Sequence, residues 1–515
     1  MQFGSRGLFL GMFVRRNKNR SGSVSIQLAF KEGRRNKVFK TVGIAHTQRE
    51  EELLIRLANN EIDRLKSVGN LFAEHDDLVV ENFVSGIGNS DLRHVGSQLI
   101  LAKIYQKVGY PTDGSRDLFK HLVLSRLISP GSKLKLVDYL KKHAKISVSV
   151  HTIYRFLDHI TDQLKSDIEQ ITFAYTQKIV GNSIGVLFYD MTTLYFEASE
   201  PDELRMLGFN KDGKHQHPQI FIGLLITHFG YPLGYDIFEG NISESHTLLP
   251  MLEKFQRRFA IDKPVIVADS ALLSKNNLHE LRKANYTYIL GGRIRNESAE
   301  IKQKILGLQV DESGPKHLYN KGKRIVVSYS AKRAKKDRHN REKGLKRLKK
   351  KVRNKKVTKG HINNRGYNKY LTLQGDARID IDYKKFNADQ VWDGLKGYVT
   401  NTKLSDREVI AQYGHLWQIE KAFRISKTDL QIRPIYHRIR TRIDAHICIC
   451  FAAYMIYKEF ERILKINNTG FSVEKALDEI RHMQELTYTL PKSGEIKTQL
   501  LNPNPSQEKL LNLMI

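Results

Sequence analysis

The pattern of apolar and polar positions changes at about residue 184, from helical spacing to an alternation of strands and helices. Three apolar runs with strand character follow closely on one another and predict an antiparallel meander. A helical pattern, a short apolar strand, a second helical pattern and a last strand come next. These runs are GVLFYDMTTLYF, QIFIGLLITHF, YPLGYDIFEG, HTLLPMLEKFQRRF, PVIVAD, LSKNNLHELRKAN and YTYILGG. The order β-β-β-α-β-α-β predicts a mixed α/β core.

The rest of the chain is arranged around this core. Residues 1–90 predict a basic N-terminal hairpin, in SGSVSIQLAF and NKVFKTVGIA, followed by a helix. Residues 91–180 are mainly helical. Their short helices are typical either of a helix-turn-helix reader, which makes this region a candidate for binding DNA ends, or of a packed helical bundle. The first part of the core is expected over 181–292. A second part is expected over 405–465, followed by a helical C-terminal tail over 466–515.

Three acidic residues lie where carboxylates are least expected. Asp190 follows an apolar strand-like run, Asp269 ends another, and Glu420 lies in YGHLWQIEKAFRISK on a helical apolar stripe. Buried carboxylates are costly unless they are compensated, and a bound divalent cation compensates them. The predicted strand order, with one Asp on the first strand and one at the end of the fourth, is that of a ribonuclease-H-like fold.

The helix that carries Glu420 has a defined start and a defined face. Ser405 and Glu408 form a capping box. From there the stripe runs through Val409, Tyr413, Leu416, Glu420, Phe423 and Lys427. Because the neighbours of Glu420 on this stripe are apolar, we expect its carboxylate to be pressed towards the core. The alternative is a Glu that reaches solvent at the edge of the core.

Composition indicates an anionic partner. The chain has 515 residues, with 85 Lys and Arg against 55 Asp and Glu, a formal net charge of +30. Such a chain binds polyanions by displacing their counterions, and nucleic acid is the expected partner. Residues 293–404 are expected to be a basic, β-rich insertion in the core, with strands in IVVSYSA and YLTLQ. Residues 331–360 of this insertion hold 16 Lys or Arg and two acids, which favours DNA contact over an ordinary solvated face.

Oxygen ligands favour particular metals and a particular reaction. Three converging carboxylates suit Mg²⁺ or Mn²⁺, and two such ions support in-line displacement at a phosphodiester. The two cysteines, Cys448 and Cys450, lie in one apolar helical run, where they predict neither a zinc site nor a disulfide and suggest a reducing compartment. The longest apolar run, 447–457, is shorter than a membrane span. No secretory signal is evident, so a cytoplasmic location and no membrane association are expected.

The motifs around the three acids resemble a known family. The sequence is similar to DDE transposases of the insertion-sequence-four family, in particular its long subgroup, over roughly residues 95–460. The family signature at the glutamate is Tyr-x2-Arg-x3-Glu-x6-Lys, and here it reads Tyr413, Leu416, Glu420, Lys427. Leu416 replaces the Arg, so a phosphate contact made there in relatives is absent or comes from Lys421, Arg424 or Arg433. The motifs that carry the resemblance are YDMTTLYFE, GFNKDGKHQHPQIFIGLL, FEGNISESHTLLP, VIVADSALLS and WQIEKAFRISKTDLQIRPIYHRIRTRIDAHI.

The resemblance implies a reaction and partners. Family members cut double-stranded DNA at terminal inverted repeats and join the 3′-hydroxyl to target DNA, often as homodimers in the bacterial nucleoid. It further implies Asp190, Asp269 and Glu420 as metal-binding catalytic residues, and Tyr413 with Lys427 as the pair that binds phosphate. Several relatives flip a base onto an aromatic residue.

The two tryptophans are candidates for stacking a flipped base. Trp392 lies at the end of the insertion and Trp417 lies three residues before Glu420, while ordinary core packing is the alternative for each.

Two other functions stay open. A ribonuclease-H-like nuclease or resolvase would share the carboxylates and the charge without needing the insertion or the N-terminal region. A catalytically silent, transposon-derived DNA-binding protein would keep the basic surfaces and tolerate neutral residues at the three acids.

Overall fold

The computed structural model divides the chain into two compact units, one of Met1–Leu92 with Leu486–Gln499 and one of Arg93–Glu485 with Leu500–Ile515. Within these units, the structure describes residues 11–33, 35–68, 75–112, 116–181, 184–197, 200–208, 216–243, 246–259, 263–272, 274–354, 356–363, 366–374, 378–491 and 493–513.

The first unit is built on a small antiparallel sheet in the order β1-β2-β3. Inward-facing side chains of the central strand, Ile26 and Leu28, pack against Ala58 and Ile62 of helix α2 and form a small core. The elements are β1 (Phe13–Lys18), β2 (Val24–Glu32), β3 (Arg35–Ala45), α2 (Gln48–Val68) and α3 (His75–Ser85).

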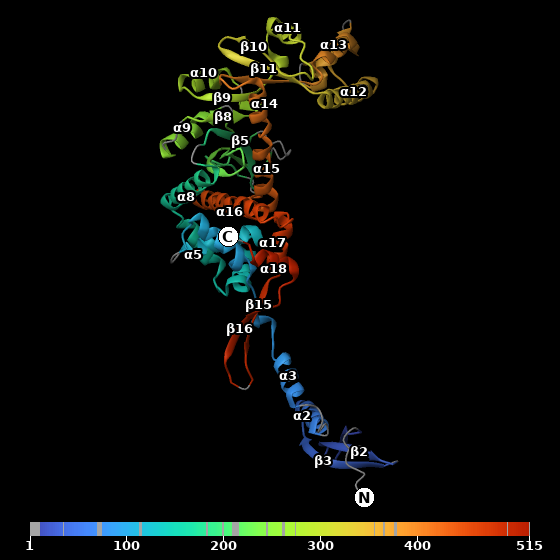
Figure 1. Cartoon of the computed structure of the whole chain (residues 1–515). Helices are drawn as coiled ribbons and strands as arrows, with labels where there is room; N and C mark the ends of the chain where they lie inside the picture. The colour runs from blue at the N-terminus through green and yellow to red at the C-terminus, as the bar shows by residue number, and fades with distance from the viewer. Residues whose placement is uncertain are drawn as a thin grey trace. The chain divides into compact units, whose positions relative to one another are not determined.

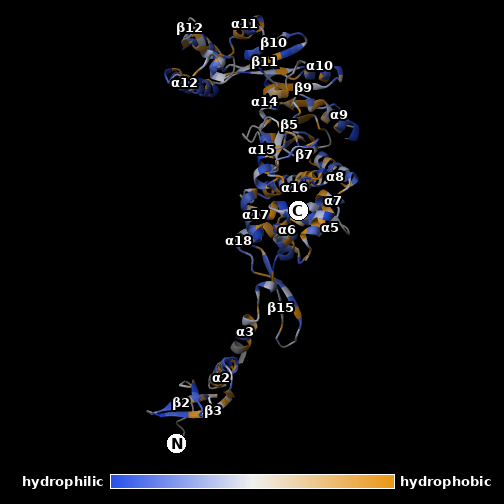
Figure 2. Ribbon diagram, turned by 180° about the vertical axis from the view of Figure 1, so that it is seen from behind, coloured by the Kyte–Doolittle hydropathy of each residue, from blue (hydrophilic) through white to orange (hydrophobic). Residues whose placement is uncertain are grey.

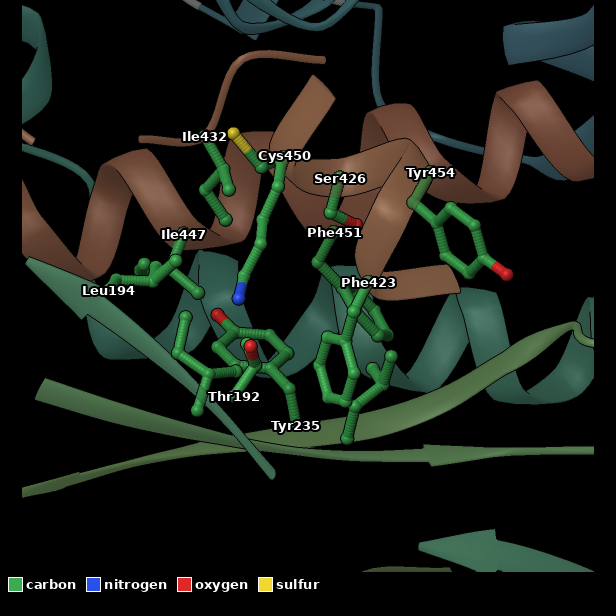
Figure 3. Close-up of a pocket in the computed structure, with 13 residues that line it drawn as sticks. Thr192, Leu194, Tyr235, Phe423, Ser426, Ile432, Ile447, Cys450, Phe451 and Tyr454 are labelled. Atoms are coloured by element: carbon green, nitrogen blue, oxygen red, sulfur yellow. The ribbon is translucent and has the colours of Figure 1, made fainter. Parts of the chain in front are cut away.

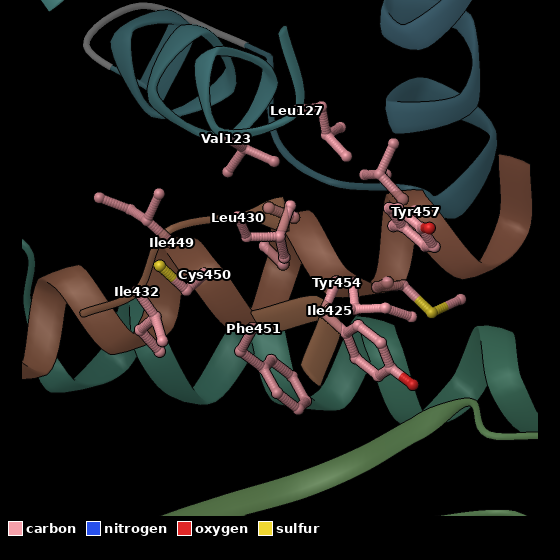
Figure 4. Close-up of a cluster of buried hydrophobic side chains, with 14 of the residues drawn as sticks. Val123, Leu127, Ile425, Leu430, Ile432, Ile449, Cys450, Phe451, Tyr454 and Tyr457 are labelled. Atoms are coloured by element: carbon pink, nitrogen blue, oxygen red, sulfur yellow. The ribbon is translucent and has the colours of Figure 1, made fainter. Parts of the chain in front are cut away.

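Helices of the second unit pack around one long buried helix, α16 (Arg440–Ile466), as the helical-bundle alternative requires. Figure 1 shows α16 between the sheet and α5, and Figure 4 shows the apolar side chains that fill this core. Ser132, Ser149 and Thr161 cap three of the surrounding helices by accepting hydrogen bonds from backbone N–H groups. These helices are α4 (Ala102–Val108), α5 (Arg116–Ile128), α6 (Lys133–Tyr139), α7 (Val150–Asp158) and α8 (Asp162–Val180).

A large mixed sheet in the order β10-β11-β14-β9-β8-β5-β6-β7 forms the centre of the second unit, which confirms the predicted mixed α/β class. Strand β5 pairs antiparallel with β6 and parallel with β8, and β8 pairs parallel with β9. The elements follow the predicted order: β5 (Val186–Tyr195), β6 (Gln219–Ile226), β7 (Pro232–Glu239), α9 (Leu248–Phe259), β8 (Val265–Ala268), α10 (Lys275–Lys283) and β9 (Thr287–Gly292).

The two faces of this sheet pack against different helices. Leu187 and Ile266 belong to the core that includes side chains of α9 and α10. Phe188 and Val267, one residue further along the same two strands, belong to the core around α16. The strict alternation of strand residues therefore assigns each position to one face.

The insertion between β9 and α14 contains helices as well as the strands expected of it. Strands β14, β11 and β10 extend the large sheet beyond β9, and the most basic segment forms the long helix α12. One side of α12 is buried through Arg341, Gly344 and Leu348, and the hydrophilic colour of the rest is visible in Figure 2. The elements are α11 (Ala299–Gly307), β10 (Lys316–Asn320), β11 (Lys323–Tyr329), α12 (Ala331–Arg353), β12 (Leu371–Gln374), β13 (Arg378–Ile381), α13 (Tyr383–Ala388) and β14 (Leu395–Thr400).

The C-terminal segment differs from the uniformly helical tail that was expected. Helices α17 (Val473–Arg481) and α18 (Pro505–Leu511) flank a hairpin of β15 (Gln484–Thr489) and β16 (Ile496–Leu500). Its first strand, QELTYT, alternates polar residues with Leu and Tyr and is rich in Thr, which favours a strand over a helix. Within the residues described above, no helix is long and apolar enough to cross a lipid bilayer.

Candidate active site

Asp190 and Asp269 occupy neighbouring positions on adjacent parallel strands. Tyr189 of β5 pairs with Ala268 of β8, so the two aspartates are the next residues on each strand. Each lies two residues beyond a side chain of the core around α16, and alternation therefore directs both carboxylates to that face of the sheet. Strand β8 ends at this point, which leaves Asp269 exposed, while β5 continues beside β6 and leaves Asp190 half-buried.

Glu420 lies on a helix that covers the same face of the sheet. Helix α15 (Trp417–Arg424) contacts β5, and α14 (Asp406–Gly414) contacts β8 and β9. The capping box of Ser405 and Glu408 at the start of α14 is confirmed.

The prediction that Glu420 is pressed towards the core is wrong, because its side chain is exposed. The helix is interrupted between Gly414 and Trp417, so the stripe counted from Ser405 does not continue in register. Ile419, Ala422 and Phe423 form the buried face of α15 instead.

Tyr413 links the end of α14 to Asp269. Its hydroxyl donates a hydrogen bond of 3.2 Å to Oδ1 of Asp269, and the same oxygen accepts the Ser270 backbone N–H at 2.6 Å. Burial raises the pKa of Tyr413, and the negative charge of Asp269 raises it further. The phenol therefore stays protonated and acts as a donor. A side chain at Gly291 would not fit, since a Cβ atom there would lie 2.6 Å from the Tyr413 hydroxyl oxygen.

Lys396 of β14 is a site residue that the sequence pattern did not indicate. Its Nζ lies 4.4 Å from the centroid of the Tyr413 ring. Burial lowers the pKa of Lys396, while the negative charges of Asp269 and Glu420 oppose that shift. One ammonium group thus interacts electrostatically with carboxylates from two separate elements. Because β14 reaches this position only through its pairing with β9, no local sequence pattern could have identified Lys396.

The basic helix α12 begins near the same site. The Ser330 N–H that precedes it donates to the Gly394 carbonyl at 3.2 Å, two residues before Lys396. Arg333, in the first turn of α12, contributes to lowering the pKa of Lys396. The positive charges of Lys396 and Arg333 therefore connect the surroundings of the carboxylates with α12.

The donor atoms around the site fit a hard divalent cation better than zinc, because they are carboxylate oxygens. In the part of the chain that the structure describes, no three His, Cys, Asp or Glu side chains are grouped closely enough to hold a metal ion. The structure therefore brings Asp190 beside Asp269, and Glu420 to the same face, without joining all three in one metal-binding group.

The remaining predicted residues have varied surroundings. Lys427, with Thr192 and Phe423, lines a small cavity of about 40 Å³ between β5 and α16 (Figure 3). Lys421 forms an ion pair of 2.5 Å with Glu461, a residue of α16. Arg424 is exposed. The guanidinium of Arg433 lies 5.7 Å from the ring centroid of Tyr195, a residue of β5.

The two tryptophans differ in exposure. Trp392 is 8% exposed and packs with Ile294 and Ile325 in the core of the insertion, as the core-packing alternative describes. Trp417, at the start of α15, is 51% exposed. Of the two tryptophans, Trp417 is therefore the one that is accessible to a ligand.

Solved transposase structures share a limited likeness with the chain. The piggyBac transposase synaptic complex with hairpin DNA is 10% identical with a TM-score of 0.38, and the match covers 75% of this chain and 76% of that one. The Mos1 transposase paired-end complex with the left transposon end is 10% identical with a TM-score of 0.16, over 35% of this chain and 58% of that one. A comparison with curated proteins gives no match.

Residues 182–456 match the family model of the transposase DDE domain. The matched region contains β5, β8, α14 and α15, and with them Asp190, Asp269 and Glu420. Because it spans more than half of the 515 residues, the chain belongs to the family of transposases with a DDE domain.

Proposed function

We propose that the protein cuts DNA at the terminal inverted repeats of a mobile element and joins the 3′-hydroxyl to target DNA, with Asp190, Asp269 and Glu420 as the catalytic carboxylates. The observation that carries this proposal is the adjacent placement of the two aspartates on parallel strands, inside the region that matches the transposase DDE domain. Two carboxylates on adjacent strands, covered by a helix that bears a third, are a suitable arrangement for phosphodiester chemistry.

The fold around the carboxylates is proposed to be ribonuclease-H-like. Support comes from the order β7-β6-β5-β8-β9, in which three antiparallel strands are followed by two parallel ones. In such a sheet the first and fourth strands along the chain are neighbours, so the residues that follow their apolar runs come together. This property explains why two local sequence patterns, separated by a helix and two strands, lead to one site.

Asp190, Asp269 and Glu420 would hold Mg²⁺ or Mn²⁺ when DNA is bound. Two such ions supply activation of the attacking oxygen and stabilisation of the leaving one. Tyr413 orients Asp269 by donating to Oδ1, which leaves Oδ2 with no hydrogen bond from this tyrosine. Lys396 contributes a positive charge that interacts with the negative charges of Asp269 and Glu420.

DNA is proposed to lie along the positively charged surfaces. Most Lys and Arg side chains of α12 are exposed and suit non-specific contact with the phosphate backbone. Arg424 and Trp417, exposed on α15, suit contact with a phosphate and with an unpaired base respectively. Tyr413 and Lys427 are retained as proposed phosphate-positioning residues, and a homodimer on paired DNA ends is the proposed assembly.

The reaction class is tested by incubating the protein with a divalent metal, a transposon-end duplex that already has a free 3′-hydroxyl, and a supercoiled plasmid. Covalent joining of the duplex to the plasmid is expected with the wild-type protein and not with Asp269→Asn. Metal-dependent nicking or junction cleavage without any joined product would identify a nuclease or resolvase instead. Binding to DNA with neither reaction, under conditions of full folding, would identify a silent DNA-binding protein.

A further inference from the structure

A strongly basic cavity lies beside the sheet, apart from the three carboxylates. It has a volume of about 500 Å³ and is formed by α5, α6, α7, α16 and the segment that leads into α16. Four of its lining residues are cations, and no lining residue in the described part of the chain is an Asp or Glu. The cations are Arg126, Lys133, Lys135 and Arg433.

Two of these cations are buried against each other. Arg126 is 6% exposed and Lys133 is 7% exposed. Burial, together with the nearby charge of Arg126, lowers the pKa of Lys133 to about 7. Among the described residues, no acidic side chain forms an ion pair with the Lys133 ammonium. A bound anion would stabilise the charged form of this buried amine.

The other groups in the wall leave the cavity positive. Arg126 donates to Nδ1 of His446 at 3.1 Å, and Nε2 of His446 lies 2.9 Å from the Ile432 carbonyl. This histidine is therefore neutral, with its proton on Nε2. Burial, followed by the charge of Lys133, lowers the pKa of His437 to about 3, so this second histidine is also neutral at physiological pH.

The acidic group that acts on His437 is already bound by a cation outside the cavity. Asp158 acts on His437, but its two carboxylate oxygens are already bound by Arg442 at 2.6 and 2.7 Å. The cavity thus combines closely placed ammonium and guanidinium groups with neutral hydrogen-bonding side chains. This donor set suits a phosphate group, since guanidinium groups can bind its oxygens in pairs.

The position of the cavity indicates where such a phosphate comes from. Arg433, on its wall, lies over the ring of Tyr195, and Ile435 forms a parallel bridge with Phe196 at the end of β5. Tyr195 is five residues beyond Asp190 on β5, or about 17 Å along the strand. Tyr436, also in the wall, is 71% exposed and is accessible to a sugar or base.

We propose that this cavity, built around Arg126, Lys133 and Arg433, binds a backbone phosphate of the DNA strand that passes over Asp190. The inference rests on the proposed function and adds a specific anchoring site for its substrate. It also gives a role to the helix pair α6 and α7, since the start of α6 and Tyr154 of α7 line the same cavity.

The test is the salt dependence of binding of the full chain to a fluorescent duplex, measured by anisotropy. Lys133→Met removes one phosphate-binding cation and should reduce the slope of log affinity against log salt by about 0.9. When the salt is lowered from about 1 M to about 0.1 M, the variant should therefore gain about eightfold less affinity than the wild type. Lys133→Arg should keep the wild-type slope. Lys141→Met removes an exposed lysine outside the cavity and is the matched control for net charge.

A second variant and a melting experiment complete the test. Arg433→Gln, which removes another cation of the lining, should reduce the slope in the same way if Lys133→Met does not fold. Melting of the wild-type protein with inorganic phosphate, at constant ionic strength, tests for a free anion as the source.

The possible outcomes separate this inference from the proposed function. Stabilisation by phosphate with unchanged DNA binding in Lys133→Met would overturn the assignment to DNA, and so would an unchanged slope in both variants. Absence of DNA binding by the wild-type chain would overturn both proposals. A reduced slope in a protein that binds DNA but joins none would leave this inference standing and remove the proposed reaction.

Discussion

The Tyr413 hydroxyl donates a hydrogen bond of 3.2 Å to Oδ1 of Asp269, and Lys396 lies over the same tyrosine ring. A neutral phenol thus donates to this carboxylate, and a cation that packs on the phenol ring interacts with it electrostatically. The phenol orients Asp269, while the ammonium offsets its charge and that of Glu420. Partners of this kind tune the ligands of metal sites.

Replacing Tyr413 by Phe should weaken metal-dependent joining without preventing DNA binding. Loss of a group that orients a metal ligand costs about 10- to 100-fold in metal affinity or activity. We expect a rise in the Mg²⁺ concentration that gives half-maximal joining. Tyr398→Phe is the matched control, because that hydroxyl lies 3.5 Å from the Ser328 hydroxyl. An unchanged metal requirement together with weaker DNA binding would instead assign Tyr413 to the phosphate.

Glu461 should stabilise the fold in a pH-dependent way. Burial alone would raise its pKa, but hydrogen bonds from Lys421 and Lys458 outweigh burial and lower the pKa to about 2. A lowered acid pKa gives stability that is fully present above pH 4.5 and is lost as the pH falls towards 2.

Glu461→Gln should therefore reduce the free energy of unfolding by about 3 kcal/mol at pH 7, and the difference from wild type should shrink steadily below pH 4.5. Urea unfolding at several pH values measures this. An equal loss at pH 7 and pH 3 would contradict the assignment. Lys421→Met should likewise lower stability with little change in DNA affinity, because Lys421 is engaged by Glu461.

Replacing each tryptophan by Ala should affect a different property, DNA binding for Trp417 and stability for Trp392. Trp417→Ala removes an exposed ring, so we expect little change in stability and a loss of about 1 to 3 kcal/mol in binding to DNA with an unpaired base. Trp392→Ala removes a buried ring and should lower the free energy of unfolding by about 3 to 5 kcal/mol. Melting and binding to a mismatched duplex check both variants. A Trp417→Ala protein that binds this duplex normally would remove the stacking role.

Exposed lysines of α12 should contribute to DNA affinity in a salt-dependent way. Changing Lys335, Lys336 and Lys346 to Gln should reduce the slope of log affinity against log salt by up to about 0.9 for each phosphate that is no longer neutralised. Arg341 is not part of this surface, because it is buried in an ion pair of 2.6 Å with Asp393. An unchanged slope in the triple variant would show that α12 does not follow the DNA backbone.

Local sequence patterns predict the positions of some site residues and not of others. Asp190 and Asp269 could be located because an apolar strand ends or turns polar at each, and strand order then made them neighbours. The exposure of Glu420 could not be predicted, because the helix breaks before Trp417 and no proline in the sequence marks this break. Lys396 depends on the pairing of Gly397 with Gly292, a tertiary contact that leaves no periodic signal.

The central claim is that Asp190 and Glu420 act together in the chemical step, and the joining rate of Asp190→Asn and Glu420→Gln tests it most directly. Both variants should bind the transposon-end duplex as the wild type does and join it to the plasmid at least about 10²- to 10³-fold more slowly in Mg²⁺. Glu253→Gln, a surface carboxylate on α9, should join normally. If either active-site variant joins DNA at the wild-type rate, the three-carboxylate account is wrong.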